Sequence, residues 1–593
     1  MDIIGEYMKK SNLTITILLC FASFGCCNDS NSATKQLYKL FDEQLEFSLR
    51  ENPVFATSYG DHRFDDKLAQ VSLEDVERRN KQAEIFLAAL KSIDRRQLSQ
   101  KDKLNYDLAK RLLEEGIKWF ELQSYLMPID QMGGFYTGFA RLSENLSFKT
   151  VQHYENYIKR LNAFKSYTEQ HLGIMRIGIK EEMVPPKVIL RQIPQSIESL
   201  IAQDINESVL YEPFKNFPPA FNQSQVEQLH SKGKQAIQEV VRPAYKKILE
   251  FVTDEYIHAG RDEISIYGLP NGGEYYRQSI RDYTTLELSP ETIHEIGKSE
   301  VARIKKEMME LIERTDFKGN FKEFKNYIQT NKRFRADSAE EMLMQVAWIM
   351  KKTDGELPKF FKVLPRMPVG IKKVPSYTEA TSPIAYYSSP SLDKTRAGFY
   401  YVNTYDVINK SLYNLTATTL HETNPGHHLQ IALAHEINDV PLFRRMAGFT
   451  AYTEGWALYA EQVGEEMGIY EDEYSRFGKL DNDMWRACRL VVDTGIHHFG
   501  WPRQKAIDYM LENTSLDKDN VIVEVNRYIA WPGQALSYKI GELKILELRK
   551  KAEKQLVGKF DIREFHNVIL RQGALPLDIL QQKVEQWLSS VQN

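Results

Sequence analysis

The sequence predicts a mainly α-helical protein with one small β-sheet. From residue 37 onward, apolar residues recur at steps of three and four, as in residues 37–52, 76–93 and 102–122, and this spacing places them on one face of a helix. Hydrophobic residues make up 42% and charged residues 27% of the chain, which is typical of a folded soluble protein. The formal net charge of -4 lacks the excess of lysine and arginine that phosphate binding requires, so we expect no contact with nucleic acid.

The first 27 residues resemble a bacterial lipoprotein signal. Lysines precede an apolar run at residues 13–25 that is too short to cross a bilayer. The run ends directly before Cys26, where a lipid would be attached after cleavage, and a polar tether follows at residues 28–36. We therefore expect a periplasmic or cell-surface protein that contacts a membrane only through this lipid, with an ordinary cleaved signal peptide as the alternative.

After the tether we expect an N-terminal helical lobe at residues 37–275 and a catalytic lobe at residues 276–593, or one integrated domain. Segments rich in Pro, Gly and Asn separate the helices, and the one near residue 270 is taken as the boundary. In the second lobe, Ser289 and Pro290 fit the N-cap and the first residue of a helix.

One segment predicts β-structure. Residues 397–404 read AGFYYVNT, and their aromatic and β-branched side chains are typical of a strand. Because this strand precedes the helix that carries the candidate site, it could serve as an edge on which an extended peptide pairs. Simple core packing is the alternative.

Cysteine usage argues against disulfides and against a cysteine nucleophile. Of the four cysteines, Cys20, Cys26 and Cys27 lie in the signal segment, which leaves Cys488 alone in the mature chain. No intramolecular disulfide can then form. Cys488 lies in an apolar helical stretch, so we expect a small buried core residue.

A histidine–glutamate pair carries the candidate chemistry. His421 and Glu422 begin the sequence HETNPGHH, which is similar to the HExxH motif of zinc peptidases, where the histidines bind zinc and the glutamate acts on the attacking water. The second histidine of that motif lies one turn along the helix. Here His427 and His428 lie six and seven residues on, and on a straight helix neither could share an ion with His421.

The Pro-Gly pair between these histidines offers a solution. Pro425 cannot donate a hydrogen bond back to His421, and Gly426 tolerates almost any backbone angle. We therefore predict that the helix bulges at this point and that His427 is the second metal ligand. His428 is the rival ligand or a substrate contact, and a polar helix cap is the plain structural alternative.

A third ligand is expected on the following helix. Glu454 lies between the aromatic residues Tyr452 and Trp456, and a carboxylate that such residues bury needs a partner, which a cation supplies. Glu461, seven residues later, lies on the same helical face and could orient a ligand, or it is a surface charge.

A second polar cluster surrounds another Pro-Gly break. We predict that Tyr538 or Arg527 stabilises the oxyanion that forms as water attacks. Tyr528, Gln534 and Lys539 are candidates for substrate contact or for an alternative ligand. The structural alternative is a pair of helices capped at the break.

Three segments resemble the bacterial domain-of-unknown-function 885 family: residues 421–430, 453–461 and 526–545. Weaker similarity at residues 58–68 and 283–297 extends the resemblance over nearly the whole mature chain. It implies a largely helical, zincin-like zinc peptidase with a deep cleft, often a lipoprotein, and it identifies no substrate.

Together the motifs predict a zinc metallopeptidase that cleaves short peptides with Glu422 as general base. The preference for short peptides comes from the cleft that the resemblance implies. One alternative is an exported lipoprotein that binds metal or peptide without turnover, although a purely structural zinc site needs no carboxylate beside a water. A metallohydrolase of esters or non-peptide amides is the second alternative. The sequence does not distinguish an exopeptidase from an endopeptidase.

Overall fold

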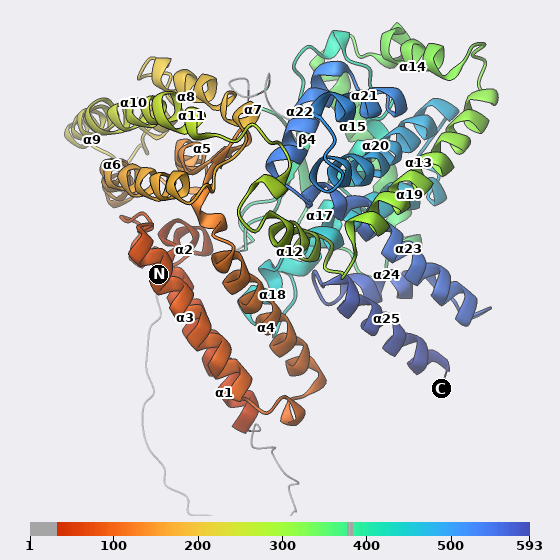
Figure 1. Ribbon diagram of the computed structural model, residues 1–593, viewed down its shortest axis with the longest axis horizontal. Coiled ribbons are helices and arrows are strands. Elements are labelled where there is room, and N and C mark those ends of the chain that lie inside the picture. The colour runs from red at the N-terminus through yellow and green to blue at the C-terminus, as the bar shows by residue number, and fades with distance from the viewer. Residues whose placement is uncertain (1–31, 376–378, 380–383, 393, 593) are drawn as a thin grey trace, which may run out of the picture.

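The computed structural model describes residues 32–592, apart from 376–378, 380–383 and 393, and is mainly helical with small sheets, as predicted (Figure 1). The predicted signal segment and Cys26 lie outside the described residues. The first helix begins at Ser32, so the last part of the predicted tether is helical, because Ala33 and Leu37 pack into a local apolar core. Within the described part of the chain, no helix is long and apolar enough to cross a membrane.

Helices form most of the first half of the chain. Two short strands, β1 (Ile129–Asp130) and β2 (Gly133–Gly134), make an antiparallel pair. The helices are α1 (Ser32–Glu51), α2 (Pro53–Tyr59), α3 (Leu73–Ser92), α4 (Gln100–Glu121), α5 (Phe135–Ala140), α6 (Val151–Lys180), α7 (Lys187–Leu190), α8 (Ile193–Ala202), α9 (Gln223–Ala236), α10 (Arg242–Phe251) and α11 (Ile257–Ala259).

The second half contains the candidate site. Its helix α13 starts as predicted, with Pro290 first and the Ser289 side chain accepting from the backbone N–H of Thr292. The helices are α12 (Gly272–Thr284), α13 (Pro290–Glu313), α14 (Phe321–Thr330), α15 (Ala339–Phe360), α16 (Leu415–Glu422), α17 (His427–His435), α18 (Leu442–Met446), α19 (Thr450–Glu466), α20 (Glu473–His497), α21 (Arg503–Asn513), α22 (Lys518–Ala530), α23 (Ser537–Gln555), α24 (Ile562–Leu570) and α25 (Leu577–Gln592).

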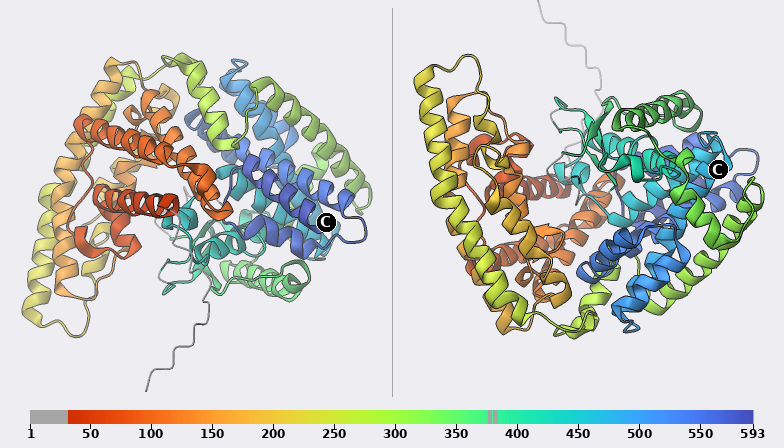
Figure 2. Two further views of the ribbon diagram at one scale, coloured as in Figure 1. Left: turned by 90° about the horizontal axis from the view of Figure 1, so that it is seen from below. Right: turned by 90° about the horizontal axis from the view of Figure 1, so that it is seen from above.

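The two halves of the chain lie side by side, with the helices up to α11 on one side and those from α13 to α25 on the other (Figure 2). The expected boundary at residues 275/276 falls inside helix α12. Apolar side chains of the first half, including Leu104 and Met183, belong to the same buried cluster as Trp456 and Ile545 of the second. One core therefore joins the two halves.

The predicted strand is confirmed as β5 (Gly398–Val402), but its expected role as a sheet edge is wrong. It lies between β3 (Val369–Lys373) and β4 (Ala385–Ser388) in the order β3-β5-β4, parallel to β3 and antiparallel to β4. Its backbone groups are therefore used on both sides, and alternate residues such as Tyr400 and Val402 are buried. An incoming peptide would have to pair with β3 or β4 instead.

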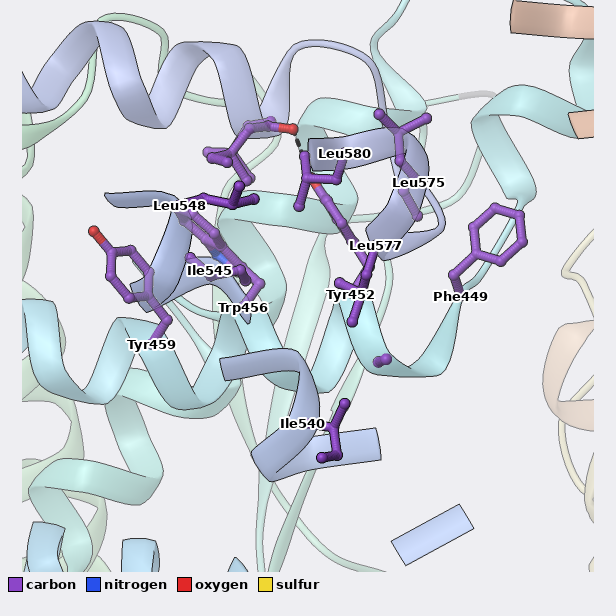
Figure 3. Close-up of a cluster of buried hydrophobic side chains, with 14 of the residues drawn as sticks. Phe449, Tyr452, Trp456, Tyr459, Ile540, Ile545, Leu548, Leu575, Leu577 and Leu580 are labelled. Atoms are coloured by element: carbon purple, nitrogen blue, oxygen red, sulfur yellow. Dashed lines mark hydrogen bonds between the residues drawn. The ribbon is translucent and has the colours of Figure 1, made fainter. Parts of the chain in front are cut away.

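Helices α19 and α23 approach each other unusually closely. A Cβ atom on Gly541 would lie 1.8 Å from the carbonyl oxygen of Ala451, and one on Gly455 would lie 2.4 Å from the carbonyl carbon of Gly541. Beside this contact, Tyr452 and Trp456 of α19 pack against apolar residues of α23 and α25, such as Ile545 and Leu577 (Figure 3). The contact fixes α19, which carries the predicted third ligand, against α23.

We expect Gly541→Ala to destabilise the protein by about 3 kcal/mol, at the upper end of the usual cost of overpacking, because the methyl group meets backbone atoms that cannot rotate away. Gly116→Ala is the matched control, since a Cβ there meets nothing within 4 Å and alanine favours a helix by roughly 0.5–1 kcal/mol over glycine. Denaturant unfolding of both variants tests this expectation. Equal stability of the two would show that α19 and α23 can separate at no cost.

Candidate metal centre

The segment HETNPGHH forms two short helices rather than the predicted bulge in one helix. Helix α16 ends at Glu422, and α17 begins at His427. Between them, the backbone N–H of Gly426 donates to the carbonyl of Leu420 at 3.0 Å, and that of His428 donates to the carbonyl of Thr423 at 3.2 Å. The chain therefore turns back on itself and brings the second helix beside the end of the first.

Close approach explains the glycine in this turn. A Cβ on Gly426 would lie 2.0 Å from the carbonyl oxygen of His421, so a side chain could not fit there. Its φ of -78° and ψ of -128° also lie outside the helical and extended regions that other residues prefer, as the argument from the backbone freedom of glycine predicts. The Asn424–Pro425 peptide bond is cis, and the indole of Trp456 donates to the carbonyl of Pro425 at 2.8 Å.

Three of the predicted ligands converge. The Nε2 atoms of His421 and His427 each lie 3.5 Å from Oε2 of Glu454, and the three ligand atoms all lie within 4.8 Å of one another. These distances are long for hydrogen bonds between such groups. They suit a shared ion, because two atoms that each lie about 2.0–2.1 Å from a tetrahedral zinc are roughly 3.3 Å apart.

Glu454 reaches this point from the opposite side of α19 to the aromatic residues that were expected to bury it. Tyr452 and Trp456 face the apolar cluster (Figure 3), whereas the Glu454 side chain faces the two histidines and stays 18% exposed. Positions two residues apart on a helix differ by about 200°. Glu454 therefore lies where the third ligand was predicted, but the aromatic residues do not surround its carboxylate.

Glu461 lies where an orienting carboxylate was expected, and it is buried rather than on the surface. Its Oε1 lies 2.8 Å from Nδ1 of His421, which leaves Nε2 of that ring toward Glu454. Its Oε2 accepts from the side-chain amide of Asn482 at 3.3 Å. A carboxylate behind a metal-binding histidine fixes the ring and its tautomer, so this contact fits a metal centre.

The histidines and carboxylates of this cluster shift one another's pKa values. Burial alone would lower the pKa of His421, but the carboxylates of Glu454 and Glu461 raise it to about 10. Burial alone would raise the pKa of Glu454, but the imidazoles of His427 and His421 hold it well below its usual value. The carboxylate of Glu454 thus stays ionised beside the histidines, and this is a favourable environment for a cation.

Glu422 is the half-buried last residue of α16. Among the described residues its carboxylate makes no side-chain hydrogen bond or ion pair, although its charge adds to the effect of burial in raising the pKa of Tyr400. It follows His421 directly in the chain and takes no part in the ligand cluster. Its carboxylate is therefore not committed to a partner among the described residues.

His428 points away from the cluster. Its Nδ1 lies 2.9 Å from the Tyr387 hydroxyl and its Nε2 lies 2.9 Å from the carbonyl oxygen of Met367, so both ring nitrogens have partners. Burial lowers its pKa to about 4, which keeps the ring neutral. The geometry favours His427 over His428 as the second ligand, and His428 instead ties α17 to β4 and to the segment before β3.

The predicted oxyanion residues form a cluster of their own. The Nη2 of Arg527 donates to the side-chain oxygen of Gln534 at 3.0 Å and to the Tyr538 hydroxyl at 3.2 Å. Tyr538 lies three residues, or about one helical turn, before Gly541, where α23 touches α19 beside Glu454. This packing brings the helix that carries Tyr538 against the helix that carries Glu454 of the candidate metal centre.

Two residues proposed for substrate contact are used elsewhere. The ammonium group of Lys539 is fully buried and ion-paired with Asp483, Glu542 and Glu300, which uses its three donors, so the prediction for this residue is wrong. The buried Tyr528 hydroxyl accepts from Trp485 and Arg489, both at 3.1 Å. Tyr528 therefore orients Trp485 and Arg489, and these contacts occupy its hydroxyl.

Sequence analysis missed the polar residues of α20. Asn482, Arg486, Arg489 and Asp493 are all buried, and their spacing of four, three and four places them on one face of the helix. The stretch around Cys488 was interpreted as apolar, and Cys488 is indeed buried. The same periodicity applied to polar residues would have found this second face.

Comparisons with known proteins identify the family. The sequence model of a bacterial family of proteins of unknown function, DUF885, matches residues 53–584. Since this is most of the chain, the protein belongs to that family. No curated protein matches it.

Two solved structures share the fold. One is the crystal structure of a putative lipoprotein from Colwellia psychrerythraea, with a TM-score of 0.88 and 29% identity over 94% of this chain and 100% of that one. The other is a putative lipoprotein of unknown function from Shewanella oneidensis, with a TM-score of 0.71 and 16% identity over 93% and 99%. At that identity, the second shows the fold alone.

Proposed function

We propose that this protein is a zinc-dependent metallopeptidase of zincin-like fold that hydrolyses short peptides in a cleft between its helices. The observation that carries the proposal is the convergence of His421, His427 and Glu454. Three protein ligands with a free fourth position are typical of catalytic zinc, whereas structural zinc sites are closed by four ligands. Glu422 follows the ligand His421 in the chain, and its charge acts on that histidine, so its carboxylate would supply the base that hydrolysis needs.

The chain's own residues divide the chemistry among them. When bound, zinc would polarise the attacking water and the peptide carbonyl. Glu422 accepts a proton from the water as its oxygen attacks the carbonyl carbon, and it passes this proton to the amine as the C–N bond breaks. Tyr538 or Arg527 stabilises the negative charge on the carbonyl oxygen.

A binding lipoprotein without turnover is the second candidate, because the two solved relatives are described as putative lipoproteins. That description also supports export and attachment by lipid at Cys26. It agrees equally with an anchored enzyme, and the free carboxylate of Glu422 favours the enzyme. A metallohydrolase of esters or non-peptide amides would use the same residues.

We expect about one zinc per chain after purification without chelator, following the rule of three ligands and a water for catalytic sites. Elemental analysis measures the metal, and mass spectrometry of a mixed peptide library measures cleavage and the end that is trimmed. Removal of the metal should stop cleavage, and added zinc should restore it. If no metal binds even after zinc is added, the enzyme proposal fails.

A further inference from the structure

The polar face of α20 leads away from the candidate metal centre. It begins at Asn482, which contacts Glu461 behind His421, and continues through Arg486 to Arg489. Arg489 lies seven residues further on, or on the order of 10 Å along the helix axis. An extended peptide spans such a distance with about three residues. Groups on this face could therefore contact a substrate a few residues from the bond that is cleaved.

Positive charge exceeds negative charge where this face meets α22. Arg489 forms a 2.9 Å ion pair with Glu524, and Arg527 lies 3.6 Å from the same carboxylate. Among the described residues, no other carboxylate lies within ion-pair distance of either guanidinium. Two fixed positive charges thus share one negative charge in a largely buried setting, and burying an unbalanced charge is costly.

Several donors in this cluster have no acceptor. The buried atoms Nη1 of Arg489, Nε of Arg527 and Nε of Arg486 make no hydrogen bond within the described part of the chain. The rings of Trp485 and Tyr538 lie 4.4 Å and 4.2 Å from the Arg489 guanidinium and hold its plane in place. Unpaired donors on a buried cation are costly unless a ligand supplies the acceptors.

The cluster is open on one side. The side chain of Arg527 is 18% exposed, as is that of Glu454, whereas that of Arg489 is only 2% exposed. A ligand would therefore meet Arg527 first, with Arg489 behind it. The arrangement suits an anion with two acceptor oxygens, because guanidinium groups bind carboxylates with paired hydrogen bonds.

We propose that Arg527 and Arg489 bind a carboxylate of the peptide substrate, either its C-terminus or an acidic side chain, within a few residues of the cleaved bond. The inference rests on the proposed peptidase function and adds its substrate class. It also gives Arg527 a positioning role in the substrate complex and leaves the oxyanion to Tyr538.

Binding measurements test this without turnover. Full-length zinc-loaded protein carrying Glu422→Gln is titrated with N-acetylpentaalanine as the free acid, as its C-terminal amide, and as the amide with one alanine replaced by glutamate. We expect the free acid or the glutamate peptide to bind roughly 10- to 100-fold more tightly than the plain amide, the range for hydrogen bonds to a charged group. Tighter binding of the free acid would identify the carboxylate as the C-terminus, and tighter binding of the glutamate peptide would identify it as an acidic side chain.

Variants then locate the effect. Arg527→Gln should remove the preference for the carboxylate peptide over the plain amide, and Arg527→Lys should restore part of that preference because charge remains without the paired donors. Arg503→Gln is the matched control. Arg503 lies outside the cluster and donates to the side chain of Asn526, the residue before Arg527. Thermal melts confirm that each variant is folded.

The outcomes separate this inference from the proposed function. Equal binding of all three peptides, no binding, or a preference that survives Arg527→Gln would overturn the carboxylate site, even if the parent protein hydrolyses peptides. A carboxylate preference that depends on Arg527 would support the site even if the parent protein proves inactive, in which case only the peptidase proposal fails.

Discussion

Replacing Glu422 by glutamine should leave the metal bound and lower kcat roughly 100- to 10,000-fold, the usual contribution of a general base. The amide keeps the shape of the side chain but cannot accept the proton of the water. Since Glu422 makes no side-chain hydrogen bond or ion pair among the described residues and lies outside the ligand cluster, stability should change little. Metal content and the rate of peptide cleavage are the two measurements.

The chain contains a matched control for this variant. Glu436 follows His435 as Glu422 follows His421, but its Oε1 accepts from the backbone N–H groups of Arg366 and Met367. Glu436→Gln keeps that acceptor and should leave cleavage unchanged. Cleavage at the parental rate by Glu422→Gln would exclude Glu422 as the base.

Zinc affinity should fall by more than roughly 100-fold in His427→Ala, since loss of even an outer contact to a metal ligand costs 10- to 100-fold. His428→Ala should keep zinc, because both nitrogens of that ring are bonded to Tyr387 and Met367. It should instead lower the free energy of unfolding by roughly 1–3 kcal/mol, the cost of leaving buried polar groups unpaired.

Competition with a chromogenic chelator measures zinc affinity, and denaturant unfolding measures stability. The two variants serve as controls for each other, because the residues are adjacent on α17. Zinc retained in His427→Ala and lost in His428→Ala would reverse the assignment of the second ligand.

Sequence reasoning located the ligand cluster because the chemistry limits the choice of residues. His421, His427 and Glu454 are of the types that zinc prefers, and the helix rise showed that no straight helix could join the two histidines. It did not show how the chain would bend. A proline marks where a helix stops, but where the next one starts depended on the contact of Gly426 with the His421 carbonyl.

Long-range pairing explains the other failures. The strand at residues 398–402 alternates between buried and partly exposed residues, whereas β3 and β4 have no fully buried residue, and only their register with β5 shows that β5 is central. Lys539 carries the charge expected of a substrate contact, yet it pairs with Glu542 of its own helix and with Glu300 and Asp483 from two other parts of the sequence. A pattern within one segment does not reveal which carboxylates the fold will bring to it.

The close contact of Gly455 with Gly541 also limits which parts of the protein can move relative to one another. It joins the helix that carries Glu454 to the helix that carries Tyr538 without intervening side chains, so the two residues belong to one rigid block. Their spacing is set before any substrate arrives, and such preorganisation is what lowers the barrier in an enzyme site. In the proposed peptidase, motions that admit a peptide and release its fragments must therefore occur in other parts of the molecule.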